Sequence, residues 1–260
     1  MENLYPQVQV DVITIVKNCS DVILQTLSSV SSQTYEYINH IIIDGKSTDN
    51  TKILIDSFKH NKNVNVYEQD GHGIANAFNN GLRQSQGEIV IFLNAGDSFI
   101  DENVLSKVVD SYIKEKWLWS FGETISVSKK KLLKRYIKQY KTWSNEYLLY
   151  GNPMCHQSTF YSRHILNQIG LYNENLKLGM DYDFNIRASL TRSPFLLYFP
   201  ISYYDTSGVS SIRVFRSFRT ARKIRNLYFP LSITKNFLID SISFAKAIKR
   251  FIMIPIKLLF

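Results

Sequence analysis

The chain has 260 residues, of which 45% are apolar and 20% charged, proportions that are ordinary for a globular protein and exclude an intrinsically disordered chain. Its formal net charge is +9, and the excess is local, because residues 212–260 carry eleven Lys and Arg against one acid, Asp240. No apolar stretch approaches the roughly 20 residues that span a bilayer, and the first ten residues lack the pattern of a secretory signal.

The first hundred residues alternate short apolar runs with segments whose apolar residues have helical spacing. We predict strands at residues 8–16, 40–44, 64–68 and 89–93, and helices at 21–32, 50–60 and 74–85. Alternation of strand and helix at this pitch is typical of a parallel sheet with right-handed crossover connections. The run 89–93 is apolar at every position, which indicates a strand buried on both faces of that sheet.

Polar residues follow each of these strands. Asn18, Asp44, the segment 70–73 and Asp97 come after the first, second, third and fourth strands. The carboxyl ends of parallel strands meet at one edge, which is where ligands bind in open α/β sheets. A carboxylate at that edge can hold a hard divalent cation, which in turn holds phosphate oxygens. The alternative for Asp97 is an ordinary aspartate in a solvated turn.

The second half of the chain has a different pattern. A helix is predicted to open with Asp181 and Asp183, and carboxylates two residues apart on a helix point in different directions. At most one of the two therefore faces a given substrate atom. The other elements that we predict here are a helix at 103–116, strands within 117–127, a turn and strand-like run at 151–161 that contains His156, and a last strand at 195–201.

Five stretches of the chain resemble, in order, the motifs of family 2 glycosyltransferases of the colanic-acid and surface-polysaccharide type. The resemblance covers roughly residues 8–211. It implies an α/β protein with the GT-A fold, in which a Rossmann-like, mostly parallel sheet is flanked by helices. The five stretches are residues 13–18 (Ile-Thr-Ile-Val-Lys-Asn), 44–51 (Asp-Gly-Lys-Ser-Thr-Asp-Asn-Thr), 70–81 (Asp-Gly-His-Gly-Ile-Ala-Asn-Ala-Phe-Asn-Asn-Gly), 93–97 (Leu-Asn-Ala-Gly-Asp) and 181–183 (Asp-Tyr-Asp).

The same resemblance implies roles for single residues. Asp181 is implied as the catalytic base, and Asp97 as the protein ligand of a Mg²⁺ or Mn²⁺ ion. Contacts with the nucleotide and the donor sugar are implied for Thr14, Val16, Asn18, Asp44, Lys46, Gly73, Asn76, Asn94 and Ala95. A place on the acceptor side or behind the base is implied for His156, Gln157, Asp183 and Arg187.

Three of these roles have structural alternatives. Asp44 could instead cap a helix, and His156 could be a hydrogen-bonded histidine of the core. Arg187 lies one helical turn after Asp183, so it could pair with that carboxylate rather than with a diphosphate. The chain also has a single carboxylate, Asp97, in the acidic motif where relatives have several.

The activity that the resemblance implies is inverting, metal-dependent glycosyl transfer. The donor would be a nucleotide-sugar, with uracil the favoured base, and the acceptor a hydroxyl of a saccharide carried on a polyprenyl diphosphate in surface-polysaccharide biosynthesis. Two alternatives remain: a sugar-phosphate nucleotidyltransferase, which normally opens with a glycine-rich phosphate loop that is absent after the first strand, and a membrane-bound scaffold that has lost its metal site. Cys19 and Cys155 have neither metal-ligand nor disulfide spacing, so we expect a reduced, cytoplasmic setting.

The basic segment 212–260 is predicted to form a tail outside the catalytic domain, 1–211, whose nucleotide-binding half is about 8–100 and acceptor half 101–211. Arginines recur in it at three-residue steps from Arg213, with aromatic residues between them, which on a helix gives a basic face beside an apolar one. We expect this amphipathic extension to bind an anionic membrane surface on the inner face of the cell membrane, each cation contributing about 1 kcal/mol. The alternatives are packing on the catalytic domain or pairing in a homodimer. A nucleic-acid partner is not expected, because no module that reads nucleic acid is recognisable.

Overall fold

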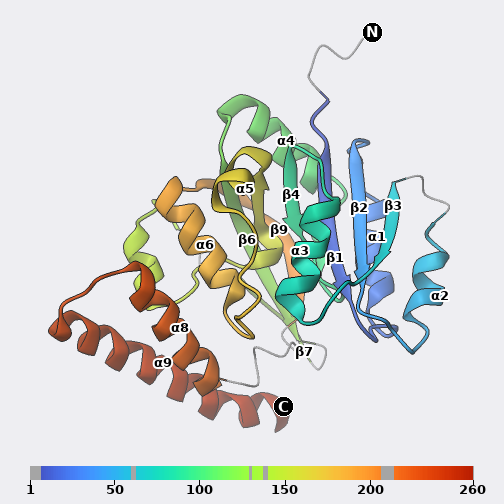
Figure 1. Ribbon diagram of the computed structural model, residues 1–260. Helices are drawn as coiled ribbons and strands as arrows, with labels where there is room; N and C mark the ends of the chain where they lie inside the picture. The colour runs from blue at the N-terminus through green and yellow to red at the C-terminus, as the bar shows by residue number, and fades with distance from the viewer. Residues whose placement is uncertain (1–6, 60–62, 129–130, 137–139, 206–213, 260) are drawn as a thin grey trace.

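The computed structural model describes residues 7–59, 63–128, 131–136, 140–205 and 214–259 (Figure 1). The strands are β1 (Val10–Val16), β2 (Ile38–Asp44), β3 (Val64–Glu68), β4 (Ile89–Phe92), β5 (Ser98–Phe99), β6 (Trp119–Ser128), β7 (Lys131–Tyr136), β8 (Thr159–Ser162) and β9 (Phe195–Asp205). The α-helices are α1 (Ile23–Ser31), α2 (Thr51–Asp56), α3 (Ile74–Gln84), α4 (Val104–Glu115), α5 (Arg163–Ile169), α6 (Met180–Thr191), α8 (Val214–Tyr228) and α9 (Ile233–Leu259). Two short 3-10 segments, η1 (Asn145–Tyr150) and η2 (His156–Ser158), lie between β7 and β8.

The strands of the described residues form one sheet in the order β3-β2-β1-β4-β8-β6-β9-β5, with β7 paired to β6. β1 is parallel to β2 and β4, and β2 is parallel to β3. β8 is antiparallel to both of its neighbours, β4 and β6, and β6 is parallel to β9. The predicted α/β fold, with a Rossmann-like, mostly parallel sheet flanked by helices, is confirmed. Antiparallel pairing enters with β5, β7 and β8.

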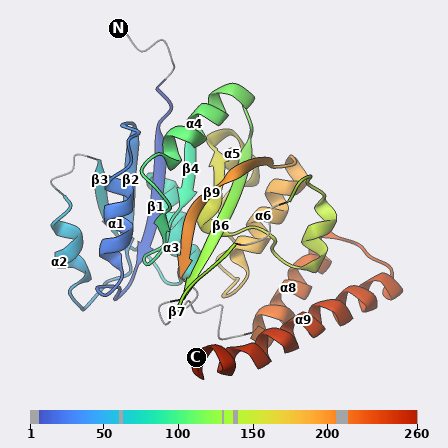
Figure 2. The ribbon, with the colours of Figure 1, turned by 180° about the vertical axis from the view of Figure 1, so that it is seen from behind.

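Helices cover both faces of this sheet. α3, α5 and α6 lie in front of it in Figure 1, and α1 and α4 lie in front of it in Figure 2, which is the view from behind. Side chains alternate between the two layers: Ile13 and Phe92 pack with residues of α3 and α6, whereas Val12 and Ile91 pack with residues of α1 and α4. Because the central strands are buried on both faces, β4 is an unbroken apolar run.

Several elements differ from the predictions. The helix predicted at 50–60 is the six-residue α2, while β9 contains the strand predicted at 195–201 and ends at Asp205. The two-residue β5 and the seven-residue α5 were not predicted, because elements this short hold too little of a hydrophobic period to be recognised. The predicted domain boundary after residue 211 falls within 206–213 and lies outside the described residues.

The C-terminal segment forms two helices that pack on the rest of the chain. α8 lies between α6 and α9 in Figure 1, and α9 also contacts η1. Asp240 of α9 pairs with Arg222 and Arg225 of α8, at 2.7 and 2.8 Å. The Lys246 Nζ of α9 lies 5.2 Å from the centroid of the Tyr150 ring in η1. Among the described residues, no helix has both the length and the apolar content that crossing a bilayer requires.

A fully buried carboxylate, Asp11 on β1, ties the centre of the sheet together. Its Oδ2 accepts hydrogen bonds from the backbone N–H groups of Gln86 and Gly87, both at 2.7 Å, and lies 3.8 Å from the Arg163 guanidinium. Its Oδ1 accepts a bond of 3.2 Å from the Asn39 amide of β2. Asp11 therefore joins β1 to β2, to α5 and to the turn that leads into β4.

Replacement of this carboxylate should be costly. In Asp11→Ala, two backbone N–H groups and Arg163 lose their partner in the interior, so we expect the free energy of unfolding to fall by about 3–5 kcal/mol. Urea unfolding measures this loss. The matched control is Asp56→Ala, which removes a pair of 2.6 Å with Lys59 that is nearly half exposed, and we expect a loss of about 0.5 kcal/mol or less there. Equal losses in the two variants would contradict the role given to Asp11.

Candidate active site

The strands of the nucleotide-binding half end together at one edge of the sheet. Val16 of β1 lies beside Asp44 of β2, and Asp44 lies beside Glu68 of β3. The ladder continues beyond β4, because the Leu93 N–H donates to the Ile13 carbonyl at 2.9 Å. The loops after β1 to β4 therefore meet at this edge, where the polar residues after each strand predicted a ligand site.

Asn18 and Asp44 hold the first two of these loops. The Asn18 Oδ1 accepts a bond of 2.8 Å from the Thr48 N–H, and the Asn18 N–H donates to the Ser47 hydroxyl at 2.9 Å. The Asp44 Oδ1 accepts a bond of 2.6 Å from the same hydroxyl. Asp44 thus closes the turn over residues 44–47 and does not cap α2, which begins at Thr51.

Lys46 lies in the loop after β2, whereas Gly73 and Asn76 lie just before and within the first turn of α3, at the same edge. The Lys46 Nζ lies 3.3 Å from the Glu68 carboxylate, and both side chains are about two-thirds exposed. Gly73 precedes α3 with φ 94°, and a Cβ at this position would meet no atom within 4 Å. The Asn76 amide donates to the Glu174 carboxylate at 3.2 Å. Asn76 therefore links the first half of the chain to the second. At Gly73, the side of the backbone where a Cβ would stand faces no other atom within 4 Å.

Two other residues predicted to contact the donor are buried in the sheet. The Thr14 hydroxyl donates to the Leu93 carbonyl at 2.7 Å and lies 2.9 Å from the His40 Nε2, whose pKa burial lowers to about 3. Val16 packs in the cluster that α1 and α2 form with Ala95. Strands with both faces covered turn their side chains into the core, so the structure does not bring those of Thr14 and Val16 to the loops.

The turn after β4 presents Asp97. The Asp97 N–H donates to the Asn94 carbonyl at 3.0 Å, and Gly96 takes φ 93° between them. The Thr26 hydroxyl of α1 donates to the Asp97 carbonyl at 2.7 Å and accepts from the Gly96 N–H at 3.0 Å. The Asn94 Oδ1 is buried and has no hydrogen-bond partner among the described residues. Thr26 thus holds the backbone of the turn, and, within the described part of the chain, the Asn94 Oδ1 is an unpartnered acceptor in the same turn as Asp97.

Asp181 and Asp183 share the first turn of α6 and point to different partners, as predicted. The Asp181 Oδ2 accepts a bond of 2.9 Å from the Asn152 amide. Asp183 is 3% exposed and is bonded by Arg187, at 3.0 Å, and by the Tyr228 hydroxyl of α8, at 2.8 Å. Arg187 also donates to the Leu171 carbonyl at 2.9 Å. Of the two alternatives for Arg187, the structure shows the ion pair with Asp183.

His156 and Gln157 lie in η2 with polar atoms that lack partners. His156 is 7% exposed, its ring stacks on Phe92 with centroids 4.9 Å apart, and neither ring nitrogen has a partner among the described residues. The Gln157 Nε2 is likewise unpartnered in that part of the chain. Burial lowers the pKa of His156 to about 4, against the opposing charge of Asp181, so the ring is neutral at pH 7. His156 is therefore buried without being a hydrogen-bonded core histidine.

Asp181, the predicted base, and Asp97, the predicted metal ligand, lie on the same side of the molecule, near Cys155. Burial raises the pKa of Cys155 to about 11, with the charges of Asp181 and Asp97 as smaller causes. Asn152, three residues before Cys155, donates to the Asp181 carboxylate, and His156, the next residue, stacks on Phe92 of β4, the strand that leads to Asp97. Asp97 and Asp181, far apart in the chain, therefore converge on the same region, next to His156.

Three residues of this region were missed by sequence reasoning. Thr26 holds the Asp97 turn, Asn152 holds Asp181, and the Asn185 amide in turn donates to the Asn152 Oδ1 at 3.1 Å. None of them stands in a spacing that points to a site. Asn152 does have a signal, because it follows Gly151 and precedes a proline in a segment with an unexplained histidine.

The donor set fits a cation that arrives with its substrate. Among the described residues, no group of three or more His, Cys, Asp and Glu could hold a metal ion. Mg²⁺ commonly takes one or two carboxylates from a protein and completes its shell with phosphate oxygens and water. Asp97 and the unpartnered Asn94 Oδ1 can supply such a partial shell.

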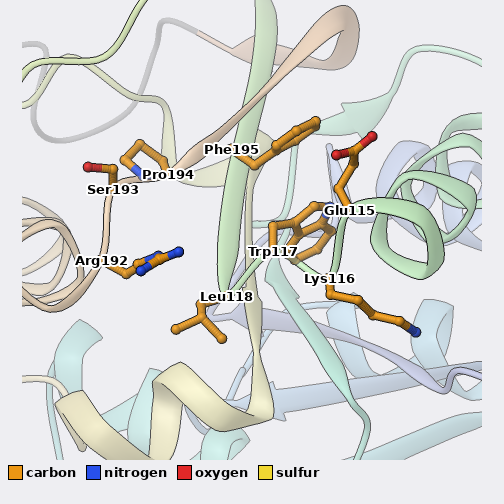
Figure 3. A pocket seen from close by; sticks show the side chains of 8 residues that line it. All are labelled: Glu115, Lys116, Trp117, Leu118, Arg192, Ser193, Pro194 and Phe195. Atoms are coloured by element: carbon orange, nitrogen blue, oxygen red, sulfur yellow. The ribbon is translucent and has the colours of Figure 1, made fainter.

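A pocket of about 600 Å³ lies away from this region. Figure 3 shows its lining, which includes Trp117 and Leu118 just before β6 and Pro194 and Phe195 at the start of β9. β6 runs in the same direction as β4, since both are antiparallel to β8. The pocket therefore lies at the amino ends of these strands, on the opposite edge from Asp97.

Comparisons with known proteins find relatives among the glycosyltransferases. The model of the family described as "Glycosyl transferase family 2" matches residues 11–170. An uncharacterized glycosyltransferase of Mycobacterium tuberculosis (strain CDC 1551 / Oshkosh) is 29% identical over 208 residues, which are 78% of each chain. The Escherichia coli enzyme named UDP-Glc:alpha-D-GlcNAc-diphosphoundecaprenol beta-1,3-glucosyltransferase WfaP is 31% identical over 99 residues, 38% of this chain and 39% of WfaP.

Solved structures show the same fold. S. aureus TarS (residues 1–349) in complex with UDP-GlcNAc superposes with a TM-score of 0.67 and 20% identity, over 93% of this chain and 72% of TarS. The mannosyltransferase PcManGT from Pyrobaculum calidifontis, in complex with GDP-Man and Mn²⁺, superposes with a TM-score of 0.59 and 16% identity, over 93% of this chain and 75% of that one. With more than half of its length matched by the family model, this chain belongs to glycosyl transferase family 2 and is a glycosyltransferase of GT-A fold.

Proposed function

We propose that this glycosyltransferase is inverting and metal-dependent, and that it transfers a sugar from a UDP-sugar to a hydroxyl of a lipid-linked saccharide in surface-polysaccharide biosynthesis. The observation that carries the proposal is the convergence of Asp97 and Asp181 on residues 152–156, where Asn152 donates to Asp181 and His156 stacks on Phe92 of the strand that leads to Asp97. One carboxylate at the strand ends and a second on α6 suit a reaction with a leaving group on one side and a base on the other. Family membership favours this over a nucleotidyltransferase.

Asp181 would act as the general base. Its carboxylate would take the proton of the acceptor hydroxyl while that oxygen attacks the anomeric carbon. The diphosphate departs from the opposite face of the sugar, so the configuration at that carbon inverts. A Mg²⁺ or Mn²⁺ ion, held by Asp97 with the Asn94 Oδ1, would supply positive charge to the departing diphosphate.

The substrate classes follow from the loops and from the relatives. Donor contacts are proposed for Asn18, Asp44, Lys46, Gly73, Asn76 and Ala95 at the strand ends. Uracil is proposed as the base because TarS was solved with UDP-GlcNAc and WfaP is named for UDP-Glc. The WfaP acceptor, a diphosphoundecaprenol-linked sugar, supports a polyprenyl-linked acceptor here. His156 and Gln157 have spare polar atoms for its hydroxyl groups.

We further propose that α8 and α9 hold the enzyme on the anionic inner face of the cell membrane. Ile233, Phe237, Phe244 and Ile248 of α9 are 89%, 74%, 47% and 38% exposed, and their spacing places them on one stripe of the helix. The basic residues outnumber the acids around this stripe, and Asp240, the single acid of residues 214–249, already pairs with two arginines. Exposed apolar groups with a positive excess suit an anionic lipid surface. A homodimer through the same stripe is the competing outcome.

The metal role of Asp97 can be tested by thermal shift with UDP, with and without Mn²⁺. We expect Mn²⁺ to add to the shift that UDP gives the wild-type protein, since a ligand at 100 times its Kd stabilises by about 2.7 kcal/mol. Asp97→Ala should lose the metal-dependent increment while UDP alone still shifts its melting temperature. Asp110→Ala, on an exposed position of α4, is the control and should behave as the wild type. A full increment in Asp97→Ala would refute the metal assignment, whereas a wild-type protein with neither an increment nor transfer would favour the scaffold without a metal site.

The base role of Asp181 can be tested with UDP-glucose and UDP-N-acetylglucosamine as donors, water as acceptor and Mn²⁺ present. Asp181→Asn should bind UDP as the wild type does, while UDP release falls by about 100-fold or more because a general base contributes 10²–10⁴-fold. Proton NMR of the sugar first released should show the β anomer from these α-linked donors. Unchanged turnover in Asp181→Asn, or release of the α anomer, would contradict the assigned mechanism.

Membrane binding can be tested by co-sedimentation with phosphatidylcholine vesicles that contain phosphatidylglycerol. We expect the wild-type protein to bind, with less binding at high salt, and Ile233→Ser/Phe237→Ser to bind several-fold more weakly. Ile53→Ser, at an exposed apolar position of α2, is the control and should bind as the wild type. Unchanged binding in the double variant, together with a change of molar mass by light scattering, would favour the homodimer instead.

A further inference from the structure

We propose that Asn152, Asn185 and Tyr161 are positioning residues that fix the Asp181 carboxylate in one orientation. The inference rests on the proposed function, in which Asp181 is the base. The Tyr161 hydroxyl donates to the Asn185 Oδ1 at 2.5 Å, and the Asn185 Nδ2 donates to the Asn152 Oδ1 at 3.1 Å. The Asn152 Nδ2 then donates to the Asp181 Oδ2 at 2.9 Å. The three bonds form one chain that ends on the carboxylate.

The direction of this chain is dictated by its two ends. An ionised carboxylate only accepts hydrogen bonds, so Asn152 must turn its NH₂ group toward Asp181. Its carbonyl then faces Asn185, which must donate, and the Asn185 carbonyl accepts from Tyr161. Burial raises the pKa of Tyr161 well above its usual value, with the charge of Asp181 as the next cause, so the phenol keeps its proton and remains a donor.

The hydrogen-bond chain is anchored in the buried core of the second half of the protein. Tyr161 of β8 is fully buried, with its ring parallel to that of Trp119 and 6.1 Å away. Asn185 is also fully buried and lies one helical turn after Asp181, on the same side of α6. Asn152, in the loop before η2, bridges these two positions of the helix. The hydrogen bonds thereby connect the Asp181 carboxylate to the core of the sheet.

The two oxygens of Asp181 acquire different tasks from this arrangement. Oδ2 is occupied by Asn152, whereas Oδ1 accepts no hydrogen bond from the described residues, which leaves it to take the proton of the acceptor. A displacement of about 1 Å in a catalytic group can cost 100-fold in rate. Buried amides are also costly unless all their bonds are made, and both side-chain atoms of Asn185 are satisfied here.

Two variants and one matched control test the proposal, with UDP release from UDP-glucose and UDP-N-acetylglucosamine as the assay. Asn152→Ala should lower kcat by about 10–100-fold while KM for the donor stays within about twofold. Tyr161→Phe, which keeps the ring and removes only the donated proton, should lower kcat by a smaller factor in the same way. The matched control is Asn145→Ala, because Asn145 of η1 also reaches α6, through the Ser189 carbonyl at 3.4 Å, without contacting Asp181. It should change the melting temperature but not kcat.

A double-mutant cycle separates positioning from a merely structural role. If Asn152 acts through Asp181, Asn152→Ala should have no further effect on the residual rate of Asp181→Asn. The positioning role would be overturned if the fold losses in kcat of the two single variants multiply in the double variant. It would also be overturned if Asn152→Ala and Asn145→Ala have the same kcat while Asp181→Asn is impaired. Wild-type turnover in Asp181→Asn would instead show that the base assignment itself fails, and the positioning role with it.

Discussion

The candidate site depends most on the hydrogen bonds of the Thr26 hydroxyl. It lies in α1, under the carboxyl ends of β1 and β4, and holds the turn of residues 94–97 by a bond to the Asp97 carbonyl and one from the Gly96 N–H. The parallel strands bring four loops to this edge, but strands alone do not decide where a side chain on a loop points. Thr26 fixes the backbone of the turn, so the position of residue 97 is set by the protein before any ligand binds.

The nucleotide-binding half could be predicted from the sequence because its rules are local. A central strand covered on both faces must be apolar, so β4 was recognisable from the apolar run 89–93 between Gly87 and Gly96. Parallel pairing then requires a helix between strands, and the carboxyl ends must share an edge. These constraints were sufficient to predict that Asn18, Asp44 and Asp97 follow neighbouring strands. The resemblance to known motifs added the activity and the part of Asp181.

The rest of the site could not be predicted, because it depends on partners that are distant in the chain. Nothing about residue 152 indicates that its amide meets α6, and nothing about Tyr228 indicates that its hydroxyl meets Asp183. Thr14 shows the opposite case. It stands in a recognised motif, but its hydroxyl is hydrogen-bonded to His40 and to the Leu93 carbonyl. A motif marks a region of the backbone, whereas the direction of each side chain is decided by packing.

The bond between Tyr228 and Asp183 has a practical consequence for how much of this protein is needed. The family match ends at residue 170, yet α8 lies against the beginning of α6, where Ile224 is within reach of Gly179 and Tyr228 satisfies a buried carboxylate two residues from Asp181. A recombinant fragment that ends at residue 170 would lack both α6 and α8. A fragment that ends before α8 would keep Asp183 but remove the Tyr228 hydroxyl that donates to it. An exchange of C-terminal segments between relatives, made to change where the protein is localised, would also change the contacts that hold α6 beside the proposed base.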